Sequence, residues 1–158
     1  MIVVADSSPL HYLILLDQVE LLHRFYGDVL VPDPVAAELG APASPSRVRG
    51  WIGDRPSWLQ IVLVSAADLA SITDELDPGE RAAIALALRV RADVLLIDDS
   101  AGRAEAARRS LRVTGTLAVL RTAAEEGLID VREVLARLAQ TTFYVDQSLL
   151  SKVFGRWL

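Results

Sequence analysis

The chain of 158 residues contains no cysteine, a single lysine and only two histidines. The absence of cysteine excludes a disulfide scaffold, a thiol nucleophile and any zinc site with cysteine ligands. It also favours an intracellular protein, and we expect a cytoplasmic location. His11 and His23 lie in apolar helical stretches without metal-ligand spacing, so we expect core or surface roles for both.

Long apolar stretches and phosphate-binding loops are also missing. No apolar stretch approaches the roughly 20 residues that a helix needs to cross a bilayer. The first residues, Met1 to Asp6, have no basic segment and do not resemble a secretory signal. We therefore expect no membrane contact. Neither the Gly-x-x-x-x-Gly-Lys-Ser/Thr loop nor the Gly-x-Gly-x-x-Gly turn occurs, which argues against the common nucleotide and dinucleotide sites.

Positive charge is in the minority, with 16 basic residues against 21 acidic ones and a net charge of −5. All the basic residues except Lys152 are arginines. The overall field repels phosphate, so any nucleic-acid binding must use a local basic patch, metal ions at the acids, or both. A hydrophobic content of 52% excludes intrinsic disorder, and the length suits one domain over residues 1–158.

Short β-branched stretches alternate with longer segments of helical periodicity. We expect strands at residues 2–5, 29–31, 61–64 and 94–97. Their nearly continuous hydrophobicity indicates burial on both faces. This pattern predicts an α/β fold, a three-layer α/β/α sandwich around a parallel sheet. Residues of about 131–158 should form a C-terminal helical segment whose apolar stripe packs in the core or binds a partner.

Acidic residues follow the expected strands. Asp6 comes after the first strand, and Asp98 and Asp99 come after the strand at 94–97. Glu38 lies on the short helix after the second strand, and Glu80 lies near the start of a long helix. Because parallel strands end at one edge of a sheet, these carboxylates should gather there. Carboxylates without neighbouring cations need raised pKa values or hard metal ions, so Mg²⁺ or Mn²⁺ is the expected counter-charge.

Four of these five acids also have an ordinary structural interpretation. Asp77 and Glu80 fit a capping box, and Asp99 fits the N-cap of the next helix. Glu38 could lie on a solvated helix face, and Asp6 could merely assist the start of the first helix. These alternatives stay open for each residue, but the joint arrangement at one sheet edge favours a functional site.

Two other acid-based chemistries fit the sequence less well. A phosphatase of the haloacid-dehalogenase type has a second aspartate two positions after the first, whereas this chain has Asp6-Ser7-Ser8. A two-component receiver domain places its acid pair after the first strand and a lysine after the last. Here the pair follows a later strand, and no lysine lies near Thr114.

Several motifs occur in order over nearly the whole chain. They are Val3-Val4-Ala5-Asp6-Ser7-Ser8-Pro9-Leu10, Val31-Pro32 with Val35 and Glu38-Leu39, Leu76-Asp77-Pro78-Gly79-Glu80-Arg81-Ala82-Ala83-Ile84, Leu95-Leu96-Ile97-Asp98-Asp99 with Arg103, and Val113-Thr114-Gly115-Thr116-Leu117 with Gly127-Leu128-Ile129. Together they resemble the PIN-domain family, and among its members the toxin-like branch of predicted nucleic-acid-binding proteins.

The resemblance implies a metal-dependent endoribonuclease that cleaves RNA, as the toxin of a toxin–antitoxin pair. It implies catalytic roles for Asp6, Glu38, Glu80, Asp98 and Asp99. Of these, all but Glu38 would be ligands of Mg²⁺ or Mn²⁺, and which of the two adjacent aspartates faces the metal stays open. The resemblance also implies a homodimer and a protein antitoxin as partner.

Residues for RNA contact are expected beside the acids. Ser7 would neighbour the first carboxylate, and Arg103, Arg108 and Arg109 form a local basic patch after the acidic pair. The ordinary alternatives are an ion pair between Arg103 and Asp99, four residues apart on one helix, and a solvated helix face for the other two. The alternative function is a non-catalytic nucleic-acid-binding or protein-interaction module with a PIN-like fold.

Overall fold

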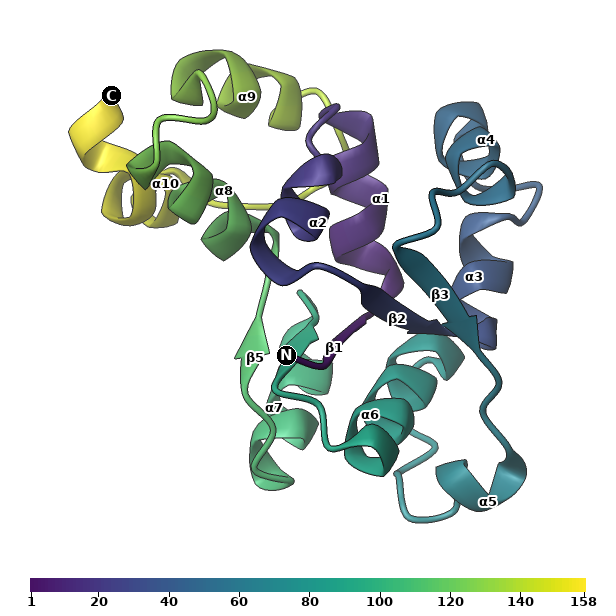
Figure 1. Ribbon diagram of the computed structural model, residues 1–158. Helices are drawn as coiled ribbons and strands as arrows, with labels where there is room; N and C mark the ends of the chain where they lie inside the picture. The colour runs from purple at the N-terminus through teal and green to yellow at the C-terminus, as the bar shows by residue number, and fades with distance from the viewer.

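A computed structural model describes all residues from 1 to 158. Five strands form one sheet in the order β3-β2-β1-β4-β5 (Figure 1). Their bounds are β1 Val3–Ala5, β2 Val29–Pro32, β3 Leu59–Val62, β4 Val94–Leu96 and β5 Val113–Thr114. Every neighbouring pair is parallel, which confirms the predicted α/β fold with a parallel sheet.

Two strands differ from the sequence prediction. The third was expected at 61–64, but it begins at Leu59, because β2 pairs with β3 from Val29 opposite Leu59 onwards. Leu63, which the prediction placed inside the strand, is 77% exposed. The fifth strand was not predicted, because two residues show no periodicity. It is defined by its pairing with Leu95 and Leu96.

Alternate strand residues supply two separate cores, one on each face of the sheet. Val3 and Ala5 belong to the larger core, and Val4 belongs to the smaller one. The larger core is built with α1 (Ser7–Leu15), α2 (Glu20–Tyr26), α3 (Asp33–Leu39), α4 (Ser46–Gly53), α8 (Thr116–Glu125), α9 (Val131–Leu138) and α10 (Gln147–Phe154). The smaller core is built with α5 (Ala66–Leu69), α6 (Pro78–Val90) and α7 (Ser100–Arg108). Helices therefore cover both faces, as the predicted three-layer sandwich requires (Figure 1).

The C-terminal segment, expected to be helical over about 131–158, contains α9, α10 and a short 3₁₀ turn at Gly155–Trp157. Residues 139–146 join α9 to α10 without regular structure. Phe154 near the end of α10 is fully buried in the larger core, so part of the apolar stripe packs inside the molecule. None of the helices combines the length and the apolar character that a membrane crossing requires.

The strand order sets the place of a ligand site. From β1 the chain runs outward through β2 to β3, and it then returns to place β4 on the other side of β1. In parallel α/β sheets, ligands bind outside the carboxyl ends of the strands where the order reverses in this way. The two strands at this point, β1 and β4, are the ones followed by Asp6 and by Asp98 with Asp99.

The packing of α10 gives a testable prediction. Substitution of Phe154 by alanine should lower the free energy of unfolding by about 3–5 kcal/mol, because it removes a fully buried aromatic side chain and leaves a cavity. Urea denaturation measures this change. Leu149 on the same helix is 43% exposed, so Leu149→Ala is the control and should cost less than about 1 kcal/mol. Equal losses in the two variants would contradict the packing of Phe154 in the core.

Candidate functional site

An acidic cavity of about 380 Å³ lies outside the carboxyl ends of β1 and β4. Its lining consists of Asp6, Ser7, Ser8, Tyr12, Glu38, Asp77, Glu80, Asp98, Asp99, Phe143 and Tyr144. Six of these residues are carboxylic acids, and none is lysine, arginine or histidine. The fold thus brings together all five acids expected from the sequence and adds Asp77, which the sequence had suggested only as a cap.

Asp6 is the most buried of these acids, with 3% of its surface exposed. Its backbone N–H donates to the carbonyl of Leu96 at 2.8 Å, which fixes the residue at the junction of β1 and β4. Its Oδ1 atom is buried without a hydrogen-bond partner. Burial raises the pKa of Asp6 to about 7, and the nearby charges of Asp77 and Glu38 act in the same direction, against the lowering effect of the Ser7 N–H. The metal-free site therefore disfavours the charged form of Asp6.

Glu80 lies in the first turn of α6 and is 9% exposed. Asp77 caps this helix, since its Oδ1 accepts the Glu80 N–H at 2.8 Å, which confirms half of the predicted capping box. The return bond from Glu80 to the cap is absent, and the Glu80 side chain lines the cavity instead. Burial, followed by the charges of Asp77 and Asp99, raises the pKa of Glu80 to about 8.

Asp98 is held by three hydrogen bonds. Its Oδ1 accepts the backbone N–H of Thr116 at 2.8 Å, and its Oδ2 accepts the hydroxyls of Thr116 at 2.7 Å and Ser8 at 2.8 Å. The carboxylate thus joins the start of α1 to the start of α8. Gly115 makes this approach possible, because a Cβ there would lie 2.6 Å from Asp98 Oδ1 and 3.1 Å from Arg103 Nη1.

Asp99 caps α7, as one of the sequence alternatives predicted. Its Oδ2 accepts the backbone N–H groups of Ala101 at 3.0 Å and Gly102 at 3.2 Å. The residue is exposed at the cavity. The two adjacent aspartates therefore differ: Asp98 connects two other helices, whereas Asp99 stabilises the helix that follows it.

These acids share a cavity, but they do not form a preformed metal centre. The structure contains no group of three or more His, Cys, Asp or Glu side chains that could hold an ion. The expected centre of Asp6, Glu80, Asp98 and Asp99 is not preformed, because the last two direct oxygens to hydrogen-bond donors of the protein. Two features nevertheless suit a hard cation: the charged donors are all carboxylates, and Asp6 Oδ1 is buried without a partner.

Four helices begin beside the cavity and reduce the repulsion between its carboxylates. The helices α1, α6, α7 and α8 begin at Ser7, Pro78, Ser100 and Thr116, directly after or in contact with its acids. The start of each helix carries partial positive charge and unpaired N–H groups. Backbone dipoles therefore replace the lysine, arginine or histidine that the cavity lacks.

The three predicted arginines do not form one patch at the acids. Arg103 donates from Nη1 to the carbonyl of Ile97 at 2.9 Å and forms no ion pair with Asp99, so the alternative interpretation of an Arg103–Asp99 pair is wrong. Arg108 and Arg109 pair with Glu105 at 2.5 and 3.2 Å near the end of α7 and do not line the cavity. Arg103 lines a neighbouring groove of about 540 Å³ whose other residues are Asp98, Gly115, Leu117, Ala118, Arg121, Phe143, Tyr144, Val145, Leu149 and Val153.

Several residues of the site were missed in the sequence because only tertiary contacts bring them there. Tyr144 is 89% exposed and lines both the acidic cavity and the neighbouring groove. The preceding Phe143 meets the ring of Tyr12 edge to face at 4.9 Å, and the hydroxyls of Tyr12 and Thr142 share a hydrogen bond of 2.8 Å. No spacing in the sequence links α1 to these residues, which lie about 130 positions away.

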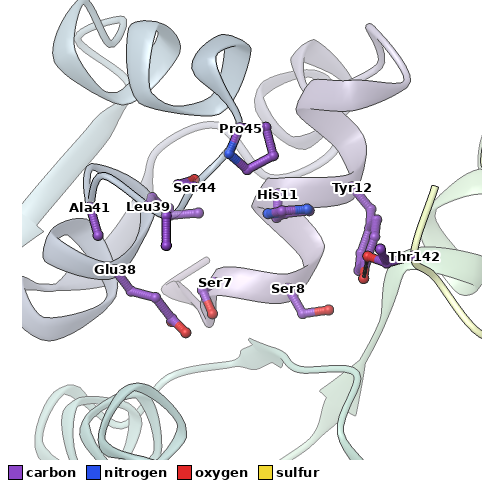
Figure 2. A pocket seen from close by; sticks show the side chains of 11 residues that line it. Ser7, Ser8, His11, Tyr12, Glu38, Leu39, Ala41, Ser44, Pro45 and Thr142 are labelled. Atoms are coloured by element: carbon purple, nitrogen blue, oxygen red, sulfur yellow. Dashed lines mark hydrogen bonds between the residues drawn. The ribbon is translucent and has the colours of Figure 1, made fainter.

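A second cavity, of about 370 Å³, adjoins the acidic one (Figure 2). Its lining is Ser7, Ser8, His11, Tyr12, Glu38, Leu39, Ala41, Ala43, Ser44, Pro45 and Thr142. Burial lowers the pKa of His11, against the raising effect of Glu38. The other histidine, His23, stacks on Trp58 with ring centres 5.5 Å apart.

The burial of Asp6 predicts a pH-dependent stability. The folded state keeps the Asp6 proton up to about pH 7, whereas the unfolded chain loses it near the ordinary aspartate pKa of 3.8, so stability falls as pH rises through this window. Each unit of pKa difference corresponds to about 1.4 kcal/mol. Without metal, Asp6→Asn should therefore raise the free energy of unfolding by on the order of 2–4 kcal/mol at about pH 8, and by little at about pH 4.

Urea denaturation of both proteins across this pH range measures the effect. Glu126→Gln is a suitable control, because Glu126 is exposed and lies outside the cavity. A stability difference between wild type and Asp6→Asn that stays constant with pH would show that burial does not raise the pKa of Asp6.

The hydrogen bonds of Asp98 give a second prediction at this site. Thr116 is fully buried, and replacing it by valine removes the hydroxyl that donates to Asp98 Oδ2. We expect Thr116→Val to lower the free energy of unfolding by about 1.5–3 kcal/mol, the usual worth of a hydrogen bond to a charged group. The matched control is Thr122→Val on the same helix, whose exposed hydroxyl contacts only the Ala118 carbonyl. A thermal or urea melt in which both valine variants match wild type would show that the hydrogen bond from Thr116 to Asp98 does not stabilise the fold.

Comparison with known proteins agrees with this geometry. A family model described as a PIN domain matches residues 2–157, which include all five strands and every acid of the cavity. The search of curated proteins and the search of solved structures gave no match. Because the family model covers nearly the whole sequence, the chain belongs to the PIN-domain family.

Proposed function

We propose that the protein is a metal-dependent endoribonuclease that uses Mg²⁺ or Mn²⁺. PIN domains are generally nucleases, so the family supports cleavage of a phosphodiester bond. The observation that carries the proposal is the gathering of six carboxylic acids around one cavity where the strand order reverses. Such a cavity attracts divalent cations and repels a bare phosphate, so a cation is needed to bring the two together.

Asp6 and Glu80 are the ligands that we propose first. Both have raised pKa values without metal, and a bound cation would favour their charged forms. Asp99 has a carboxylate oxygen that makes no hydrogen bond, whereas Asp98 contributes by fixing the positions of α1 and α8. A divalent ion held there would polarise the phosphodiester and stabilise the charge that develops on its oxygens.

The reaction that we propose is hydrolysis. The oxygen of a water molecule attacks phosphorus, the bond from phosphorus to the leaving ribose oxygen breaks, and that oxygen takes up a proton from solvent water. Glu38 is exposed and lines both the acidic and the adjoining cavity. We propose that Glu38 accepts the proton from the attacking water, since an exposed carboxylate that lines the cavity can act as a general base. Ser7, its neighbour in both cavities, would donate a hydrogen bond to the substrate.

The RNA strand would meet a cationic surface at one side of the acids. Arg103 donates one N–H to the Ile97 carbonyl, and its other N–H groups could donate to a phosphate. Arg121 lines the same groove and pairs with Glu125 at 2.9 Å. Arg108 and Arg109, which neutralise Glu105 near the end of α7, would contact only a strand that runs along this helix.

We place this activity in the cytoplasm, in one domain of residues 1–158, as the toxin of a toxin–antitoxin pair. The support is the resemblance of its motifs to the toxin-like branch of the family. In such a pair a protein antitoxin would bind the chain, and Leu149 and Tyr144 provide exposed apolar surface for this partner or for a homodimer.

A second function is a non-catalytic module that binds nucleic acid or a protein partner. One observation favours it: the structure has no preformed group of three or more acids that could hold an ion, and Asp98 and Asp99 already have hydrogen-bond donors. Under this function, RNA would bind without being cut, and Mg²⁺ or Mn²⁺ would not change its affinity.

Calorimetric titration with Mn²⁺ and Mg²⁺, together with incubation of a labelled RNA pool, tests the proposal. We expect the wild-type protein to bind metal and to cut RNA only when metal is present. Asp6→Asn with Glu80→Gln should abolish metal binding and slow cleavage by at least about 100-fold, since it removes both proposed ligands. Glu126→Gln, which removes an exposed acid outside the cavity, should leave both properties unchanged.

The outcomes separate the two functions. Metal binding and cleavage that disappear together in the double variant support the nuclease. Cleavage that survives in a folded double variant contradicts the assigned ligands. RNA binding by a wild-type protein that binds no metal and makes no cut favours the non-catalytic module.

A further inference from the structure

The cavity that contains His11 adjoins the acidic cavity. The two share Ser7, Ser8, Tyr12 and Glu38 in their linings. Its volume of about 370 Å³ falls within the range of about 300–1,000 Å³ that is usual for small-ligand pockets. The nuclease chemistry proposed above gives no role to His11 or to the residues beyond it.

The chemistry of this lining excludes a phosphate. None of the eleven residues is lysine or arginine, and Glu38 would repel an anion. The polar groups are chiefly serine hydroxyls: those of Ser7 and Ser44 can donate as well as accept, whereas that of Ser8 already donates to Asp98 and can only accept. The remaining surface is the flat imidazole of His11 with apolar side chains such as Leu39 and Pro45. An uncharged, planar, polar group fits these surroundings.

Figure 2 shows where these residues lie around the cavity. The imidazole of His11 lies in the middle of the view, between Ser44 and Pro45 on one side and Ser7 and Ser8 on the other. The wall at Tyr12 is fixed, because its hydroxyl shares a hydrogen bond with Thr142 and its ring meets Phe143 edge to face. The opposite wall is the segment of Ala41 to Pro45, which a backbone bond from Ser44 to Ala41 closes into a turn.

We propose that this cavity, which we call the His11 pocket, binds an unpaired nucleobase of the RNA strand, next to the phosphate in the acidic cavity. The base stacks on the imidazole of His11 and forms hydrogen bonds with the serine hydroxyls and with Glu38. The proposal rests on the proposed function for the identity of the ligand. It makes His11 a residue that positions the substrate and sets the preference for the base beside the cleaved bond.

Nuclear magnetic resonance of the metal-free protein tests the pocket apart from catalysis. The chain has only two histidines, so the imidazole signals of His11 and His23 can be followed separately. Titration with each of the four ribonucleosides should shift the His11 signal saturably, with an apparent Kd of about 1 mM for the preferred base. The His23 ring packs on Trp58 away from the pocket and should not move. Equal shifts of both histidines, or none at His11, would overturn the proposal.

Two variants complete the nucleoside test. Ser44→Phe places a large ring into the pocket from an exterior turn, and His11→Ala removes the stacking surface. Both should weaken nucleoside binding at least tenfold, as measured for Ser44→Phe by the His11 signal and for His11→Ala by signals of the nucleoside. Full binding in a folded Ser44→Phe protein would overturn the proposal.

RNA with a single abasic position links the pocket to cleavage. Loss of the base beside the cleaved bond should raise KM about tenfold in the wild type and have no effect in His11→Ala, as expected for a lost stacking contact. Nucleosides that bind at His11 without any RNA cleavage would support the pocket and count against the nuclease. Metal-dependent cleavage with no response of His11 and no effect of an abasic position would overturn the pocket and leave the nuclease standing.

Discussion

Electrostatic repulsion between carboxylates is the constraint on which the rest of this site depends. Six acids line one cavity without a basic side chain, so the fold must lower the energy of that charge in other ways. It does so by starting four helices at the cavity, whose N–H groups and dipoles favour nearby anions. The junction of β1 and β4 then fixes the most buried acid, Asp6, where little solvent reaches it.

The acids fall into two groups: some accept hydrogen bonds from the protein, and in others burial disfavours the charged form of the carboxylate. Asp98 and Asp99 accept hydrogen bonds from α8 and α7, so structure alone accounts for them. Asp6 and Glu80 show the opposite behaviour, since burial raises the pKa of both and one oxygen of Asp6 has no partner. A buried polar atom without a partner destabilises the folded state, which needs a functional or structural reason. Asp6 and Glu80, whose charged forms the fold disfavours, are therefore the better candidates for binding a cation.

The sequence predicted the layers of the fold, and it predicted that five acids would gather at one edge of the sheet, because both depend on local patterns. Strand hydrophobicity and the rule that parallel strands end at one edge were sufficient to bring Asp6 and Asp98 together. The sequence did not predict β5, the place of Tyr144, or the bond from Arg103 to Ile97, because each depends on contacts between distant segments. The capping alternatives were correct for Asp77 and Asp99, yet both residues also line the cavity.

For Asp77 and Asp99, capping a helix and lining the cavity are therefore compatible roles. A helix N-cap must lie at the start of a helix, and in this sheet the helices α1, α6, α7 and α8 all start at the carboxyl edge of the strands. Residues that cap these helices consequently lie around the site: Asp99 satisfies two backbone N–H groups with one oxygen and also lines the cavity.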